Sequence, residues 1–160
     1  MRSIISYYSY SGNTEKVVNI FSDVLRERGE VDIQRLKPKS EITNFIAQCK
    51  AAFTGKRAEL EGAVNFDASP YDIILIGSPV WAFAPTPAIN TFLDDLSGMN
   101  GKRAVVLLTS GSGAGVKKCF NNIRNILQNK GAHTIDEINI PDRKLADENF
   151  IRSSIEKILG

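Results

Sequence analysis

The chain has 160 residues, of which 42% are hydrophobic and 24% are charged, and its formal net charge is +2. These proportions are those of a globular protein, and a chain of this length can bury one sufficient core without disulfide bonds. We therefore expect residues 1–160 to form a single domain. Because the lysines and arginines are spread along the chain with no dense basic block, we expect no nucleic-acid partner.

The sequence carries no pattern for membrane insertion, secretion or metal binding. No apolar run approaches the roughly 18 residues that a membrane-spanning helix needs, and residues 1–14 do not read as a secretory signal, so we expect a cytoplasmic protein without a membrane span. Cys49 and Cys119 are far apart, and the single histidine, His133, falls in a predicted strand. We expect both thiols to be buried, with a catalytic thiol as the alternative. We expect the imidazole to be structural, and we expect no metal site.

In chain order, the apolar spacing alternates between that of strands and that of helices. The expected strands cover residues 3–8, 31–36, 71–77, 103–109 and 132–140, and the expected helices cover residues 13–28, 41–53, 89–96, 116–130 and 150–159. Gly29 is expected to cap the first helix at its C-terminus, and the second strand alternates as an edge strand does. Residues 55–70 are polar and are expected to form a loop.

This alternation predicts an α/β fold, a doubly wound parallel sheet between two layers of helices. Ligands of such sheets bind outside the carboxyl ends of the strands, where the strand order reverses. The loops after the first, third and fourth strands are therefore the candidate ligand site. They cover residues 9–14, 78–87 and 110–115.

The first loop, Ser-Tyr-Ser-Gly-Asn-Thr at residues 9–14, joins a strand to a helix N-terminus. Free backbone N–H groups and the helix dipole favour an anion at such a place, and hydroxyls surround Gly12, which lets the backbone bend close to a bound group. The loop is neither a Walker loop nor a dinucleotide fingerprint. It predicts a phosphate seat made of neutral donors; the alternative is a serine-rich helix cap without a ligand.

The second and third loops suit a flat ring. Trp81 and Phe83 follow a buried strand among small residues and prolines, where a planar aromatic ligand could stack on them; the alternative is that both fold inward to cap the core. Residues 110–115 contain no large side chain, so their backbone could approach a polar ring edge, or they could be a flexible connector. Together the three loops suit a mononucleotide with a large planar ring.

With these three loops in this order, the chain resembles the flavodoxin-like FMN-binding proteins over essentially its full length. The first loop is similar to the family's T-x-T-G-x-T phosphate loop, GSPVW at residues 77–81 to its G-S/T-P-x-W/Y ring loop, and residues 109–115 to its glycine-rich third loop. The resemblance implies a five-stranded sheet in the order 2-1-3-4-5. It also implies a non-covalent FMN contacted by Ser9, Tyr10, Ser11, Gly12, Asn13, Thr14, Ser78, Pro79, Val80, Trp81, Ala82, Phe83, Thr109, Ser110, Gly111, Gly113 and Gly115.

Three features depart from the family pattern. Carrier flavodoxins are usually strongly acidic, whereas this chain has a net charge of +2. The third loop lacks the Tyr or Trp that often covers the second face of the flavin, so one face could be open to a substrate or a partner. Residues 37–69, with their extra helix, could add a wall to the site or form an interface.

The resemblance implies an electron-transfer flavoprotein of flavodoxin type, serving redox partner proteins or a small electron donor or acceptor, as a monomer or homodimer. No acid or base in the loops stands out as catalytic, which favours a carrier. The alternative is an NAD(P)H-dependent flavin or quinone oxidoreductase that uses FMN. A regulatory module of receiver type would need clustered acidic residues after the first strand, where Ser9, Tyr10 and Ser11 stand.

Overall fold

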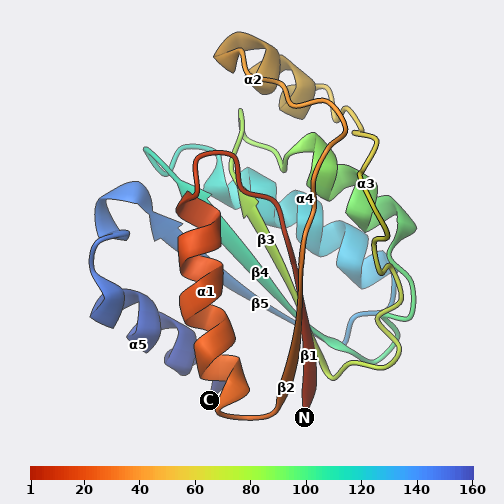
Figure 1. The fold of residues 1–160 in the computed structure, drawn as a ribbon, viewed down its shortest axis with the longest axis vertical. Coiled ribbons are helices and arrows are strands. Elements are labelled where there is room, and N and C mark those ends of the chain that lie inside the picture. The colour runs from red at the N-terminus through yellow and green to blue at the C-terminus, as the bar shows by residue number, and fades with distance from the viewer.

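The computed structural model describes residues 1–160 and shows a five-stranded parallel sheet in the order β2-β1-β3-β4-β5, which confirms the predicted topology (Figure 1). The strands are β1 (Arg2–Tyr7), β2 (Glu30–Arg35), β3 (Ile73–Pro79), β4 (Arg103–Ser110) and β5 (Thr134–Pro141). The helices are α1 (Asn13–Arg26), α2 (Phe45–Phe53), α3 (Pro87–Asp95), α4 (Val116–Asn129) and α5 (Glu148–Leu159), with a 3₁₀-helix at Asp142–Lys144. None of these helices is both long enough and apolar enough to cross a membrane.

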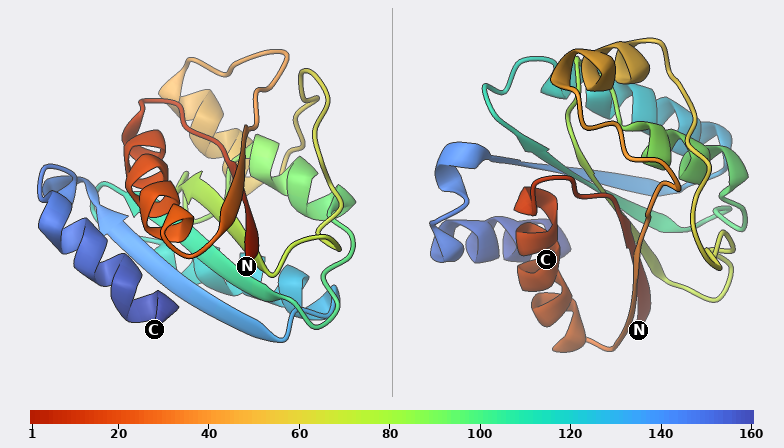
Figure 2. Two further views of the ribbon diagram at one scale, coloured as in Figure 1. Left: turned by 60° about the horizontal axis from the view of Figure 1, so that its bottom comes forward. Right: turned by 45° about the horizontal axis from the view of Figure 1, so that its top comes forward.

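The sheet separates two apolar layers (Figure 2). One layer packs α1 and α5 against the sheet around Phe21, which is fully buried, and the other packs α3 and α4 around Phe92. Because β3 and β4 are covered on both faces, nearly all of their side chains are buried, as their continuous apolar runs predict. β2 lies at the edge of the sheet and is largely exposed, also as predicted.

The first helix ends earlier than its apolar pattern predicts. α1 stops at Arg26 with Glu27 as its C-cap, so Gly29 lies beyond the cap and the predicted capping role is wrong. A side chain at Gly29 would collide with the backbone of Met1. Glycine is needed there because the turn into β2 passes close to the start of β1.

Helix α2 is the element that departs most from prediction. It begins at Phe45 rather than near residue 41, because the Asn44 side chain accepts a hydrogen bond from the Ala47 N–H at 3.1 Å and caps the helix there. α2 stands apart from the helical layers, beyond the end of the sheet (Figure 1). Its larger apolar side chains are not buried: Phe45, Ile46 and Phe53 are 75%, 76% and 69% exposed.

The cysteines and the histidine follow the predictions only in part. Cys119 is buried in α4, and burial raises the pKa of its thiol to about 12. Cys49 on α2 is partly exposed, so its predicted burial is wrong. His133 is exposed and lies just before β5, because the pairing of β4 with β5 begins at Arg103 and Thr134.

Two phenylalanines give a matched test of this core. Phe92 is 1% exposed and stacks on Phe66 with ring centroids 5.8 Å apart. We expect Phe92→Ala to lower the free energy of unfolding by about 3–5 kcal/mol, because the truncation leaves a cavity. Phe53→Ala, at an exposed position, should lower it by about 1 kcal/mol or less. Urea unfolding followed by circular dichroism measures both, and equal losses would contradict the assigned core.

Candidate functional site

The three loops singled out in the sequence meet at one end of the sheet, opposite to both chain termini (Figures 1 and 2). The hydroxyls of Thr14 and Thr109 share a buried hydrogen bond of 2.8 Å, which joins the first loop to the end of β4. The Val80 N–H donates to the Thr109 carbonyl at 3.0 Å, and the rings of Tyr10 and Trp81 lie edge to face at 6.1 Å. The first and second loops therefore contact each other, and both are joined to Thr109 near the end of β4, where the third loop begins.

The first loop presents unused hydrogen-bond donors. Gly12 adopts a left-handed conformation with φ of 92° at the N-cap of α1. No backbone N–H of residues 10–14 has an acceptor within the protein, and the Ser11 hydroxyl is exposed and has no partner. A Cβ at Gly12 would meet no atom within 4 Å, so the space beside the turn is open. Free N–H groups at a helix N-terminus beside open space fit an anion.

A charged network beneath the loop holds it in shape. Arg35 donates to the Ser9 carbonyl at 2.9 Å and forms an ion pair with Glu15 at 3.0 Å. The Tyr7 hydroxyl also donates to Glu15, and burial together with this bond raises the pKa of Tyr7 to about 12. Arg35 thus neutralises the acidic residue in the first turn of α1, which would otherwise repel an anion.

Sequence reasoning missed Arg35. Its signal is positional, because Arg35 is the last residue of β2 and pairs in register with Tyr7 at the end of β1. Once β2 is placed beside β1, the carboxyl ends of the two strands lie together, and a charged residue there reaches the first loop. The hydrophobic pattern of residues 31–36 alone could not show this.

The second loop is a tight two-residue hairpin in a strained conformation. Trp81 and Ala84 exchange two backbone hydrogen bonds of 3.0 Å, and Ala82 and Phe83 between them have φ of 45° and 70°. Left-handed backbone costs a residue other than glycine about 1–2 kcal/mol. Such strain persists only where the surroundings enforce it, and it is concentrated at functional sites.

The two aromatic side chains of this loop lie differently. Trp81 is half-buried and packs edge to face on Tyr8 at 5.6 Å, so it covers the core in part. Tyr8 is itself fixed by a hydrogen bond to Glu41 at 2.8 Å; burial, followed by that bond, raises its pKa well above the usual value. Phe83 remains 47% exposed. The alternative that both rings fold inward to cap the core is therefore true of part of Trp81 and is not true of Phe83.

Together the second and third loops line an open hollow of about 330 Å³. Residues 80–83 form one side of it and residues 110–114 form another. Helix α2 contributes Phe45, Gln48 and Cys49, none of which sequence reasoning placed in the site. Their helical spacing predicts a shared face, but it does not tell what that face meets.

The remaining hydroxyl residues of the predicted site are turned inward. Ser9, Thr14, Ser78, Thr109 and Ser110 are all buried. Their bonds run within the protein: the Ser9 hydroxyl accepts from the Glu15 N–H at 3.3 Å, and the Ser110 hydroxyl donates to the Asn139 side chain at 2.9 Å. These side chains shape the loops, while the groups left free for a ligand are mainly backbone N–H groups and aromatic rings.

A sequence profile of the family described as flavodoxin matches residues 2–157. The chain belongs to the flavodoxin family. This membership confirms the resemblance that the three loop motifs indicated, and it supports the FMN cofactor that they imply.

Solved structures share the fold at low sequence identity. A flavoprotein in complex with FMN from Lactobacillus acidophilus NCFM matches with a TM-score of 0.67 and 21% identity over 92% of this chain and 98% of its own. Oxidised flavodoxin 1 from Bacillus cereus matches with a TM-score of 0.61 and 17% identity over 100% of both chains. An azoreductase from Bacillus anthracis str. Sterne matches with a TM-score of 0.61 and 12% identity over 99% of this chain and 97% of its own. No curated protein matches the sequence.

Two glycines of the third loop test how closely it approaches the second. Gly115 and Gly113 have nearly the same φ, 79° and 78°, but a Cβ at Gly115 would lie 2.7 Å from the Phe83 Cα, whereas one at Gly113 would meet nothing within 4 Å. We expect Gly113→Ala to cost about 1–2 kcal/mol of unfolding free energy, from the backbone alone. Gly115→Ala should cost about 1–3 kcal/mol more, through overpacking.

Urea unfolding measures the two losses, and the fluorescence of Trp81, the only tryptophan, reports displacement of the second loop. Only Gly115→Ala should shift that emission. Equal losses with unchanged emission in both variants would show that the two loops are not in contact.

Proposed function

We propose that this flavodoxin-family protein binds one FMN non-covalently at the three loops and carries electrons on it between redox partners. The observation that carries this proposal is the row of unpartnered N–H groups in residues 10–14, next to a hollow lined by aromatic side chains. When bound, the flavin supplies the redox chemistry, and the protein supplies binding, orientation and electrostatics.

The residues present fit an FMN molecule in both of its parts. The N–H groups of residues 10–14 and the Ser11 hydroxyl would donate to the phosphate, and Lys16, exposed on α1 and without an ion pair, adds positive charge nearby. Trp81 and Phe83 would pack on the ring and exclude water from it. Residues 111–114 are exposed, and their backbone could approach the polar edge of the ring.

The state of the nearby titratable groups supports a carrier rather than an acid–base enzyme. Tyr8 and Tyr7 both donate to carboxylates and have raised pKa values, so neither gives up its proton readily. Glu15 is held by Arg35. Tyr7, Tyr8 and Glu15 are therefore engaged in holding structure, and electron transfer requires no proton donor from the protein.

The phosphate seat can be tested by comparing FMN with riboflavin, which lacks the phosphate. We expect FMN to bind at least about 100-fold more tightly, since two charge-assisted hydrogen bonds of about 1.5–3 kcal/mol each already give that ratio. Ser11→Asp places a carboxylate among the donors and should remove this preference while leaving riboflavin affinity unchanged. Flavin fluorescence titrations measure the dissociation constants. Equal affinities of the unaltered protein for FMN and riboflavin would contradict the seat.

A second candidate function is an NAD(P)H-dependent flavin or quinone oxidoreductase. It is favoured by the third loop, whose residues 111–114 are exposed and bear no large side chain, so that a substrate could reach the hollow. The fold is also shared by a protein described as an azoreductase, although fold alone does not define activity.

Anaerobic reduction of the FMN-loaded protein separates the two functions. For a carrier we expect the first and second electrons to enter at clearly separated potentials, and no rapid NADH or NADPH oxidation with a quinone or an azo dye. Rapid turnover with one of these acceptors, together with uptake of both electrons at one potential, would favour the oxidoreductase. Failure to bind FMN at micromolar concentrations would overturn both.

A further inference from the structure

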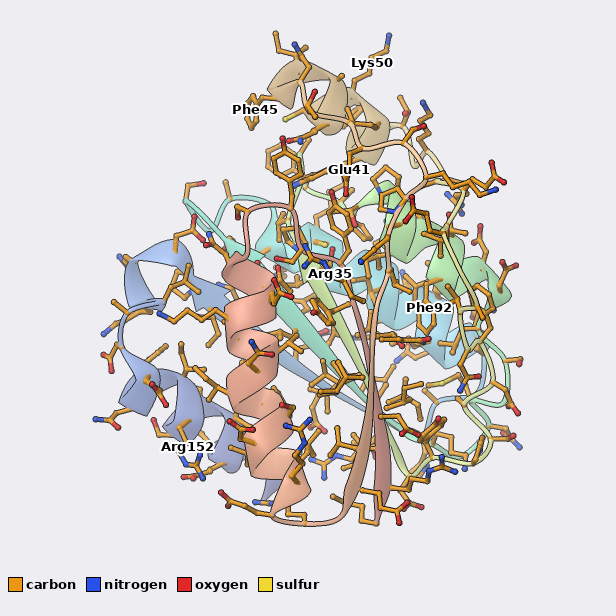
Figure 3. The ribbon with its side chains drawn as sticks, viewed as in Figure 1. Arg35, Glu41, Phe45, Lys50, Phe92 and Arg152 are labelled. Carbon is orange, nitrogen blue, oxygen red and sulfur yellow. The ribbon has the colours of Figure 1, made fainter.

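The hollow beside the second and third loops has a third wall, helix α2. On this helix Phe45, Cys49 and Phe53 are spaced four residues apart and so share one face. Phe45 and Cys49 line the hollow, yet Phe45 is 75% exposed. Figure 3 shows Phe45 projecting sideways from α2 at the end of the molecule where the loops meet, whereas Lys50 points away from the body of the protein.

Local hydrogen bonds define both ends of α2, and one contact reaches another helix. Asn44 caps its start, and the Gln48 side chain donates to the Ile42 carbonyl. At the other end, the Lys56 N–H donates to the Ala51 carbonyl at 2.9 Å. The Lys118 ammonium, on α4, lies 5.7 Å from the centre of the Phe53 ring. Local hydrogen bonds thus close both ends of the helix, and the Lys118–Phe53 contact joins it to α4, while Phe45 forms no aromatic pair within the protein.

The third loop offers nothing else that could cover a ligand on this side. Its residues 111–114 are glycine, serine or alanine, so a ring placed on Trp81 and Phe83 would meet no large side chain from that loop. Phe45 is the aromatic residue among those that α2 and the third loop contribute to the hollow. An aromatic side chain buries a large apolar area and pairs favourably with another flat ring.

We propose that α2 is the outer wall of the flavin-ring site and that Phe45 packs on the isoalloxazine ring, in the place of the aromatic residue that the third loop lacks. This inference rests on the proposed FMN function. The hollow, about 330 Å³, is of the size that small-molecule sites have. It adjoins the phosphate seat through the contact of Trp81 with Tyr10. A flavin ring is therefore the occupant that connects the exposed face of α2 with the free N–H groups of the first loop.

Two neighbouring residues of α2 give a matched test. Phe45 and Ile46 are 75% and 76% exposed, and of the two only Phe45 lines the hollow. We expect Phe45→Ala to weaken FMN binding about five- to tenfold, and Ile46→Ala to change it less than twofold. Fluorescence titration measures the dissociation constants, and thermal unfolding of the flavin-free proteins checks that both variants fold like the unaltered chain.

Cys49 provides a second readout that needs no redox activity. It lies one helical turn after Phe45 and is partly exposed, whereas Cys119 is buried. We expect saturating FMN to slow alkylation of Cys49 by iodoacetamide at least about tenfold, because the ring would lie against this face. Cys119 should remain unmodified with or without FMN, which makes it an internal control.

The outcomes separate this inference from the function on which it rests. If the unaltered protein binds FMN but Phe45→Ala binds it as tightly as Ile46→Ala does, and FMN leaves Cys49 equally reactive, the α2 wall is overturned and the FMN site stands. If the unaltered protein binds no FMN, the proposed function and this inference both fail. Weaker binding by Phe45→Ala alone, with protection of Cys49, supports the α2 wall.

Discussion

The parallel pairing of β1 with β3 and of β3 with β4 is the constraint on which the site depends. Tyr7 pairs with Gly77, and Gly77 with Leu107, so the three strands end close together. The loop that follows each strand therefore begins at the same edge of the sheet, and the Thr14–Thr109 hydrogen bond joins the first loop to β4. Loops separated widely in sequence form one surface because the hydrogen-bonding register of the sheet places the ends of their strands side by side.

At that edge the protein divides its polar groups between structure and ligand binding. Buried hydroxyls bond within the protein and fix the loops, and the Arg35–Glu15 pair removes the negative charge beneath them. What remains free is mostly backbone N–H, whose direction is set by the chain itself. A site of this kind is preorganised for an anion, since few side chains must be ordered when it binds. The left-handed residues Ala82 and Phe83 fit the same principle, because they hold aromatic surface outward at a cost in strain.

In the proposed site, the apolar face of helix α2 serves a ligand instead of the core. Its inner residues, among them Ala51 and Ala52, are buried, but its larger apolar side chains are not. In a small protein such a face stays exposed to water unless something covers it. The proposed flavin ring would be that cover. Binding of the cofactor would then also stabilise the folded position of α2.

The sequence by itself determined the alternation of strands and helices, the buried strands β3 and β4, and the three loop motifs, because each follows from local spacing and composition. Local spacing also misled. It showed that Phe45, Cys49 and Phe53 share a face, but a helical period does not tell whether that face meets the core, a ligand or water. Only the tertiary structure placed α2 beside the hollow and Arg35 beneath the first loop, since both depend on pairing between segments distant in sequence.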